Sequence, residues 1–292
     1  MTQIETLAIA DWAPQPGADE SRRLAGELEA GKVLFLPQLR FELQPLEKRF
    51  LDPRWSDRKA KNISYDPAST AIKGAQGNAS DLEDLRHLLE RFHRRSLGLI
   101  QHLLPHYTAQ LRLARASFRP LPVAGRKGSW RKDDSRLHVD AFPSRPNRGE
   151  RILRVFANVN PRGEPRLWRV GEPFADMARR FLPQIPRQLP GAAALLHALR
   201  ITKSPRSAYD HTMLQLHDRM KADADYQKNA PQQLMPFPPD CVWVCFSDQT
   251  SHAAMGGQYL FEQTLHLPVQ GLYDPDSAPL RVLERLLGRA LA

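Results

Sequence analysis

The stretch that decides the fold is Arg136-Leu137-His138-Val139-Asp140-Ala141-Phe142-Pro143, which places an imidazole and a carboxylate two residues apart near the end of a predicted strand. Successive side chains of a strand point to opposite faces, so His138 and Asp140 share one face and Val139 faces away. A histidine and a carboxylate are two of the three ligands of a 2-His-1-carboxylate iron site. We therefore expect another strand to bring a second histidine to the same place.

The predicted second histidine is His252, which follows the apolar run Val242-Trp243-Val244-Cys245-Phe246. Such a run is typical of a buried strand. The predicted metal triad is thus His138, Asp140 and His252, and His266 on the next strand is the alternative third ligand. A His-x-Asp motif also arises by chance, in which case its side chains stabilise a strand end without a metal. The motif alone leaves both interpretations open.

Composition favours a sizeable core, because 41% of the 292 residues are hydrophobic. Cys241 and Cys245 lie in one predicted strand with about 13 Å between their Cα atoms, too far for a disulfide. They are predicted to be reduced thiols of an intracellular protein. The sequence shows no signal-peptide pattern and no apolar run long enough to span a bilayer, so we expect a cytoplasmic protein.

The net charge of +10 and the isoelectric point near 9.9 predict an anionic partner. The excess comes mostly from arginines spread along the chain, and no recognisable nucleic-acid-binding motif accompanies them. A spread charge suits a polyanionic substrate or an anionic membrane surface, and we expect no nucleic-acid partner.

Hydrophobic periodicity predicts an α+β chain without internal repeats or linkers, hence a single domain over residues 1–292 with a helical insertion at about 171–230. Helices are predicted over residues 21–30, 81–104, 209–227 and 278–290, with two helical pieces within 171–199. Strands are predicted over residues 32–37, 62–65, 151–161, 242–246 and 258–268. The segment 44–84 is otherwise expected to form surface loops.

Five further histidines lie in predicted helices and form no metal-binding motif of their own. Three of them lie among charged positions of the helix 81–104 and are predicted to be on the surface, namely His87, His93 and His102. His211 and His217 are separated by about 600° of helical rotation, which places them on different faces and excludes an HExxH-type arrangement.

The order of His-x-Asp and a distant histidine resembles the 2-oxoglutarate oxygenases of double-stranded β-helix (jelly-roll, cupin-like) fold. The resemblance implies such a core with flanking helices, and Fe(II) bound by the triad with room for a bidentate 2-oxoacid and O₂. In many members an arginine on the strand after the distal histidine binds the far carboxylate. Here residues 258–267 contain no Arg or Lys. Another branch places the cation on the strand after His-x-Asp, where Arg154 lies.

The strand period puts Arg154 on one face with Phe156 and Asn158, and Arg151 on the other. Arg154 would offer 2-oxoglutarate the planar fork that suits a carboxylate. We therefore expect Arg154 to anchor the cosubstrate, with Asn158 and Gln263 as further contacts.

Longer blocks narrow the resemblance to the Kdo hydroxylase family. These blocks cover residues 129–146, 154–161, 209–218 and 257–264. The resemblance implies an enzyme that uses Fe(II), 2-oxoglutarate and O₂, with ascorbate keeping the iron reduced. The implied reaction is hydroxylation of C3 of the sugar Kdo in Kdo-lipid A, giving Ko in the lipopolysaccharide inner core. The implied location is the cytoplasm, in peripheral contact with the anionic inner membrane.

Cations near the motif in sequence are candidates for binding the Kdo carboxylate and the lipid A phosphates. The principal candidates are Arg131, Lys132, Arg136 and Arg145, and the further ones are Arg119, Arg126 and Arg148. The alternative interpretation is a solvated basic face.

Two other functions remain open on the sequence. One is a 2-oxoglutarate oxygenase acting on a protein or a small molecule. The other is a metal-free jelly-roll binding module, in which His138 and Asp140 only stabilise a strand end. A halogenase is disfavoured because Asp140 fills the position that such enzymes leave without a carboxylate. The sequence does not define the oligomeric state or which Kdo residue is modified.

Overall fold

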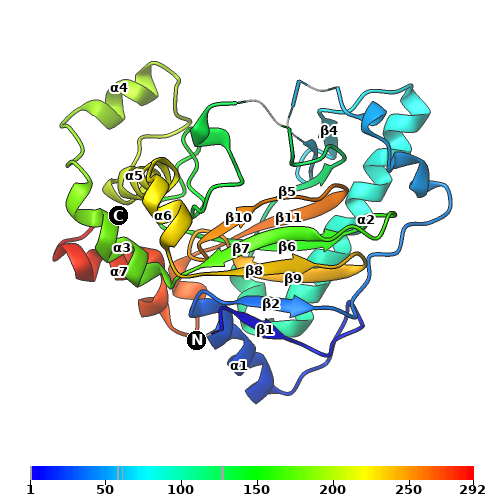
Figure 1. Cartoon of the computed structure of the whole chain (residues 1–292), viewed down its shortest axis with the longest axis horizontal. Coiled ribbons are helices and arrows are strands. Elements are labelled where there is room, and N and C mark those ends of the chain that lie inside the picture. Colours follow the sequence, from blue (N-terminus) through cyan, green and yellow to red (C-terminus); the bar gives the residue numbers. More distant parts are fainter. Residues whose placement is uncertain (1, 58, 61, 126–127) are drawn as a thin grey trace.

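Two largely antiparallel β-sheets face each other in the computed structural model, which describes residues 2–57, 59–60, 62–125 and 128–292 (Figure 1). The large sheet has the strand order β1-β2-β9-β6-β11-β5-β3-β4, and the small sheet has the order β10-β7-β8. The strands of the large sheet are β1 Ile4–Thr6, β2 Val33–Leu36, β9 Cys241–Phe246, β6 Arg151–Asn158, β11 Leu260–Leu267, β5 Arg112–Arg119, β3 Ile63–Asp66 and β4 Ala71–Lys73. The strands of the small sheet are β10 His252–Ala254, β7 Arg166–Gly171 and β8 Gln232–Phe237.

The space between the two sheets is filled by aromatic rings. Trp243 of β9 stacks on Phe237 of β8 with ring centroids 4.1 Å apart, and on Phe156 of β6 at 5.1 Å. Trp168 of β7 meets Trp243 edge to face at 5.4 Å. Rings of this size dominate the burial energy of a core. Two facing sheets with such an inner layer form the predicted jelly-roll, and the α+β class is confirmed.

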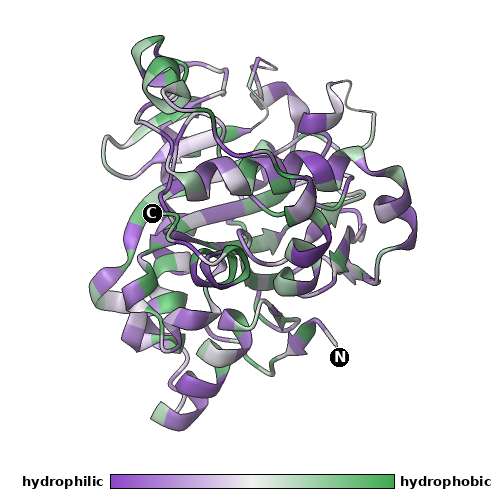
Figure 2. Ribbon diagram, turned by 90° about the vertical axis from the view of Figure 1, so that its left-hand side faces the viewer, coloured by the Kyte–Doolittle hydropathy of each residue, from purple (hydrophilic) through white to green (hydrophobic). Residues whose placement is uncertain are grey.

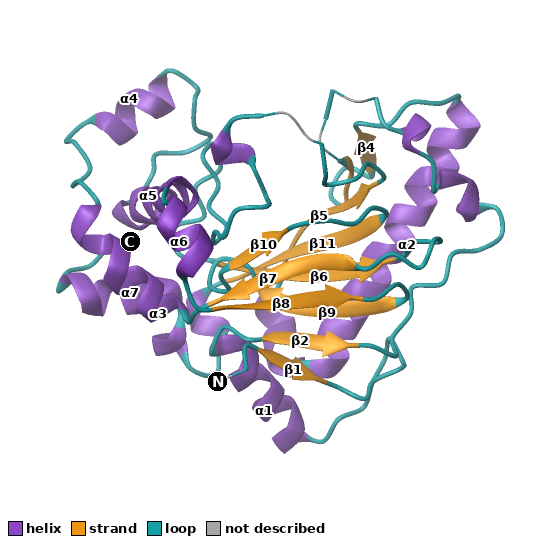
Figure 3. Cartoon of the chain, viewed as in Figure 1, coloured by secondary structure: helices purple, strands orange, loops and turns teal. Residues whose placement is uncertain are grey.

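Helices cover the outer face of the large sheet, and Figure 3 shows α2 crossing behind it. The covering helices are α1 Ala18–Glu29 and α2 Ala79–Leu103, whereas α7 Pro279–Leu287 packs against α3 Phe174–Phe181 at one end of the sheets. α2 begins at Asn78, whose side chain accepts a hydrogen bond from the Asp81 amide. None of the described helices is long and apolar enough to cross a membrane.

The alternation of β6 is as predicted. Leu153, Val155 and Ala157 pack into the core beneath the helices, whereas Phe156 packs between the sheets. All eight residues of β6 are buried, as expected for a central strand with both faces covered.

A group of helices lies at one end of the sheets, at the left of Figure 1. Its members are α3 Phe174–Phe181, α4 Ala192–Ala198, α5 Ala208–Ala222 and α6 Ala224–Asn229. The predicted continuous helix over 209–227 is wrong at residue 223, because the Asp223 side chain accepts from the Tyr226 amide and starts a new helix.

The strands β1, β4, β5, β7 and β8 are not predicted by the sequence pattern. β5 carries arginines at its first, fourth and last positions, and β8 contains Pro236 on an edge of the small sheet. The segment at His138 differs from the predicted strand end as well, since it makes one isolated β-bridge, with His252.

His93 corrects the prediction for the histidines of α2. His87 and His102 are exposed as predicted, but His93 is buried. It follows Leu89 by four residues and precedes Ser96 by three, so it lies on the buried stripe of the helix. Its Nδ1 lies 2.9 Å from Gln263 Oε1, which satisfies the buried ring.

Arg151 lies on the face of β6 opposite Arg154, as predicted, and supports the turn that precedes His252. Its guanidinium is completely buried and donates from Nε to Asp248 Oδ2 at 2.8 Å. Asp248 Oδ1 also accepts from the Ile152 amide at 3.1 Å. The ion pair therefore fixes residues 247–251 against β6.

Replacing Arg151 with methionine leaves the Asp248 carboxylate buried without its cation. We expect the free energy of unfolding, measured by urea denaturation, to fall by about 3–5 kcal/mol. The exposed ion pair of Arg23 with Glu20 provides a matched control, and Arg23→Met should stay within about 1 kcal/mol of wild type. Equal losses in the two variants would show that burial of the Arg151 pair has no special cost.

Candidate active site

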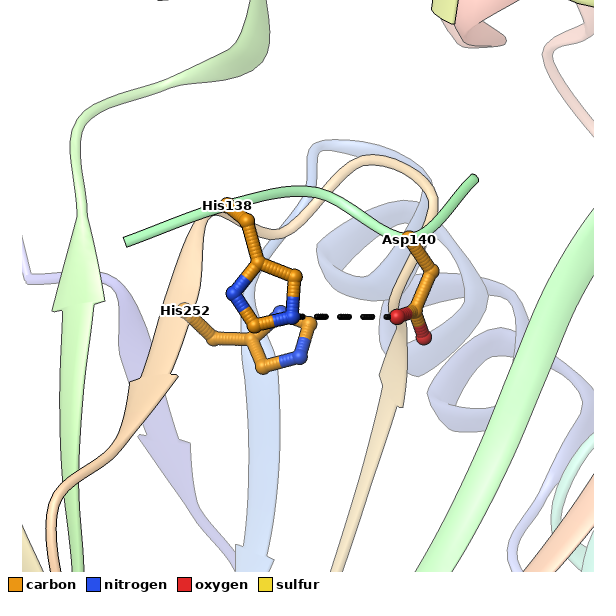
Figure 4. A group of neighbouring side chains, drawn as sticks. All are labelled: His138, Asp140 and His252. Carbon is orange, nitrogen blue, oxygen red and sulfur yellow. Dashed lines mark ion pairs between the residues drawn. The ribbon is translucent and has the colours of Figure 1, made fainter. Parts of the chain in front are cut away.

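The three predicted ligands meet at one point between the sheets (Figure 4). One ligand atom from each of His138, Asp140 and His252 lies within 4.8 Å of the other two. His138 Nε2 is 3.9 Å from Asp140 Oδ1. The backbones of His138 and His252 form an antiparallel bridge, with N···O distances of 3.0 and 2.9 Å. The structure thus assembles the triad that the sequence predicts, and His252 rather than His266 completes it.

Hydrogen bonds fix the tautomer of both imidazoles. His138 Nδ1 lies 2.7 Å from the carbonyl oxygen of Arg136, and His252 Nδ1 lies 2.8 Å from that of Thr250. A carbonyl oxygen can only accept, so each Nδ1 carries the proton and each Nε2 keeps a lone pair for a metal. Burial lowers the pKa of both histidines, which keeps them neutral at pH 7.

The ring of His252 is further held by Trp168, which stacks on it with centroids 4.9 Å apart and planes 19° apart. The His-x-Asp backbone takes its other partners from irregular structure. Gln227 of α6 accepts from the Leu137 amide at 2.7 Å and donates to the Leu137 carbonyl at 3.0 Å. The Asp140 amide donates to the Ser247 carbonyl at 2.8 Å. The Gln227 side chain and the turn at Ser247 therefore supply hydrogen bonds that a neighbouring strand would supply to a regular strand at this position.

Arg154 controls the charge of Asp140. Burial alone would raise the pKa of Asp140, but the Arg154 guanidinium lies 2.8 Å from its Oδ2 and holds that pKa far below its usual range. The carboxylate is therefore ionised under all ordinary conditions. Together with two neutral imidazole nitrogens, it forms the donor set that suits a divalent iron.

Glu262 of β11 accepts from both Arg154 and Arg119. Burial tends to raise the pKa of Glu262, and the two guanidinium groups lower it by more. Arg119 also lies 3.8 Å from Asp134. Cations and carboxylates from β5, β6 and β11 thus form one buried network beside the triad.

The network lines a cavity of about 250 Å³. The cavity is bounded by cations, carboxylates, the two histidines and apolar groups: Asn62, Arg119, Asp134, His138, Asp140, Arg154, Phe156, Arg166, Trp168, His252, Ala254, Leu260 and Glu262. Its three arginines and three carboxylates cancel, so the lining is neutral while the histidines are neutral. A divalent cation would make it +2, which matches a dicarboxylate dianion.

Two predicted cosubstrate contacts lie elsewhere. Gln263 is next to Glu262 in β11, so its side chain points to the opposite face, where it meets His93 and donates to the Ala114 carbonyl at 3.1 Å. Asn158 shares the face of Arg154 but lies at the end of β6, where its amide donates to the Phe237 carbonyl at 3.1 Å. The strand period predicts the correct face for Asn158, but the Asn158 side chain is not among those that line the cavity.

The principal substrate candidates also lie outside the cavity. Arg131 is exposed and pairs with Asp218 at 2.9 Å, and Arg136 donates to the Lys221 carbonyl at 2.7 Å. Lys132 and Arg145 are exposed to solvent. Among the further candidates, Arg148 is exposed, Arg119 lines the cavity, and Arg126 is outside the described residues.

Several lining residues were missed by the sequence reasoning. Arg166 and Trp168 alternate along β7 and face the cavity together, so recognition of that strand would have identified them. Glu262 lies in the strand 258–267, which the sequence analysis considers only for its lack of Arg and Lys. An acidic residue within this apolar strand is the feature that could have identified it. Asp134 comes from an irregular segment without a periodic signal, and Asn62 lies in the predicted strand 62–65, one residue before the observed start of β3.

Two neutral imidazoles and one carboxylate, set in a double-stranded β-helix beside a cation-lined cavity, define the class of mononuclear non-heme metal oxygenases. Comparison with protein families narrows this class. The chain belongs to the 3-deoxy-D-manno-oct-2-ulosonic acid (Kdo) hydroxylase family, whose model matches residues 11–290. The predicted family resemblance is therefore confirmed.

The chain is similar to solved structures of the Kdo hydroxylase KdoO, a non-heme Fe(II) α-ketoglutarate-dependent dioxygenase. With the cobalt(II) complex, identity is 47% over 99% of this chain and 97% of that chain, and the TM-score is 0.97. With the complex of α-ketoglutarate and Fe(III), identity is 46% over 99% of this chain and 97% of that chain, and the TM-score is 0.96. With the apo structure, identity is 47% over the same shares of the two chains, and the TM-score is 0.96. A comparison with curated proteins found no match.

Alanine at His138, Asp140 or His252 removes one of three metal donors. We expect each variant to fold normally and to lose stoichiometric binding of cobalt(II), measured anaerobically by absorption spectroscopy. His266→Ala is the matched control and should bind the metal as wild type does, because His266 is not among the residues that line the cavity. Full binding by His252→Ala together with loss in His266→Ala would reverse the assignment.

Proposed function

We propose that the protein is an Fe(II)- and 2-oxoglutarate-dependent dioxygenase that hydroxylates C3 of Kdo in Kdo-lipid A, giving Ko. The observation that carries the proposal is the His138, Asp140 and His252 triad, found in a chain that belongs to the Kdo hydroxylase family. KdoO, with which the chain shares 47% identity, is a Kdo hydroxylase that uses non-heme Fe(II) and α-ketoglutarate.

The protein's own groups suit this chemistry. His138, Asp140 and His252 would hold Fe(II), which when bound supplies the centre that activates O₂ with 2-oxoglutarate. The carbonyl oxygens of Arg136 and Thr250 keep both Nε2 atoms available to the metal. The buried walls formed by Phe156 and Trp168 exclude water from the reacting region.

Direct product analysis tests the function. Kdo-lipid A incubated with protein, ferrous iron, 2-oxoglutarate and ascorbate should gain one oxygen on a Kdo residue, detected by mass spectrometry. Omission of 2-oxoglutarate and the His252→Ala variant are the controls, and neither should give the product. Conversion of 2-oxoglutarate to succinate without oxygenation of Kdo would favour a protein or small-molecule substrate. Absence of iron binding would favour the metal-free binding module.

Arg154 is the proposed anchor for a carboxylate of 2-oxoglutarate. Its side chain is buried, faces the cavity and already pairs with two carboxylates, those of Asp140 and Glu262. A dicarboxylate bound next to the metal would meet the same guanidinium and could exchange for Glu262. Arg166 is a second candidate, because it also lines the cavity. It lies two residues before Trp168 on β7, which places it about 7 Å farther from His252 along the strand.

Arg154→Met should raise the KM for 2-oxoglutarate at least about thirtyfold, which corresponds to about 2 kcal/mol of a lost charge-assisted pair. Arg154→Lys should fall between Met and wild type, since it keeps the charge without the planar fork. Cobalt(II) affinity measured in parallel separates a cosubstrate effect from a disturbed Asp140. A normal KM in Arg154→Met with a raised KM in Arg166→Met would move the anchor to β7. Arg151→Met serves as a stability control, because that side chain faces away from the cavity.

We also propose that the enzyme works in the cytoplasm, peripherally bound to the anionic inner membrane where its glycolipid substrate resides. The support is the net charge of +10 with an isoelectric point near 9.9. Binding to vesicles that contain phosphatidylglycerol should fall steeply as salt rises, because exposed charges are screened within about 8 Å at physiological ionic strength. Sedimentation with vesicles measures this. Equal binding to neutral and anionic vesicles at low salt would contradict it.

A further inference from the structure

The segment 182–207, which connects α3 to α5 and contains α4, projects from the body of the protein at the upper left of Figure 1. All of its residues are described, and Thr202 is the only buried one among them. Its backbone is joined to the 143–144 loop, since the Lys203 amide donates to the Ser144 carbonyl at 2.9 Å. The segment therefore has a defined place but almost no core of its own.

Large apolar side chains are exposed along this segment. Leu189, Leu195, Leu199 and Ile201 are 75%, 60%, 61% and 52% exposed. They are half of the large hydrophobic residues found exposed in the described part of the chain, and they lie within thirteen positions. In Figure 2 the hydrophobic colouring of α4 is visible at the top of the molecule. Single exposed leucines are normal, but a group of them marks a surface that contacts something apolar.

The charged residues of this segment have one sign. Residues 177–209 contain no Asp or Glu, and the segment 182–207 carries the cations Arg187, Arg200, Lys203 and Arg206. Arg187, Arg200 and Lys203 are exposed. Apolar side chains bordered by cations fit the boundary between the acyl chains and the head groups of an anionic bilayer.

We propose that segment 182–207 is the membrane-docking element, which inserts Leu189, Leu195, Leu199 and Ile201 into an anionic lipid surface. The inference rests on the proposed function, since Kdo-lipid A is a membrane glycolipid. A second copy of the chain is the competing occupant. Two such segments facing each other would bring together eight cations without a carboxylate between them, whereas a surface of lipid phosphates neutralises them.

The docking element is connected directly to the active site. α5 begins at the end of the segment, where Ser207 and Asp210 form a capping box. One face of α5 carries His217, whose ring centroid lies 5.4 Å from that of His138. Insertion of the segment therefore sets the height of the metal site above the bilayer through one rigid helix.

The test compares two triple variants that are matched in residue type, number and charge. The first is Leu189→Glu with Leu195→Glu and Leu199→Glu, in the docking segment. The second is Leu46→Glu with Leu113→Glu and Leu234→Glu, three leucines that are equally exposed elsewhere. Vesicles of phosphatidylglycerol and phosphatidylcholine are the probe. We expect the first variant to lose at least about tenfold in partition coefficient and the second to change less than about threefold.

Two further measurements make each outcome decisive. Replacement of the same segment leucines by serine should lower binding without added negative charge, which isolates the apolar contribution. Light scattering reports the oligomeric state. The proposal would be overturned if both triple variants lost vesicle binding equally, or if the segment variant bound vesicles as wild type does. It would also be overturned if a dimer dissociated in the segment variant while vesicle binding stayed unchanged.

Activity on a deacylated, water-soluble Kdo oligosaccharide separates this proposal from the proposed function. The segment variant should oxygenate this soluble substrate at the wild-type rate and lose activity on vesicles that contain Kdo-lipid A. If wild type fails to oxygenate either substrate while the vesicle results hold, the enzymatic function is wrong and the docking element stands.

Discussion

The backbone bridge between His138 and His252 is the constraint on which the site depends. Its two hydrogen bonds join the His-x-Asp segment to the small sheet, and Gln227 and the turn after β9 pair the neighbouring backbone. Unpaired backbone groups in a buried position are costly, so each of these partners stabilises the irregular segment. Held by these partners, the segment keeps the side-chain alternation of a strand, so His138 and Asp140 both face His252 while Val139 packs in the core. Metal-ligand geometry is thus set by main-chain pairing between distant parts of the sequence.

Charge compensation is the second constraint. Several ionised groups lie in one small cavity, and an unpaired charge in such a place would be strongly destabilising. Arg154 forms ion pairs with Asp140 and Glu262, and Arg119 forms ion pairs with Glu262 and Asp134. The lining is neutral as a whole, so a divalent metal and a dianion can enter together without leaving net charge. This pairing gives a physical reason why the metal and the cosubstrate suit the site jointly.

The sequence predicted the triad and the face of Arg154 because both follow from the two-residue period of strands. It also predicted the buried runs at β2, β6 and β9, whose composition is strongly apolar. It did not predict that Gln263 would turn away from the cavity or that Asn158 would bond at the strand end, since these depend on register and on partners in other strands. His93 was misplaced because a polar residue on a buried stripe requires a partner that periodicity cannot supply, here Gln263. The four principal cations near the motif in sequence lie outside the cavity, which is lined instead by Arg119 of β5, Arg154 of β6 and Arg166 of β7.

The helices between β7 and β8 support the metal site from one end of the sheets. α6 supplies Gln227 to the His-x-Asp backbone, and α5 supplies Lys221, whose ammonium is buried and donates to the Arg131 carbonyl at 3.0 Å. The same helices continue from a segment that exposes leucines and lacks carboxylates. One group of helices thus braces the metal-ligand segment and carries the surface proposed to contact lipid. For a substrate whose sugar is tethered to a bilayer, this arrangement lets contact with the membrane and alignment of the sugar at the site depend on one rigid body.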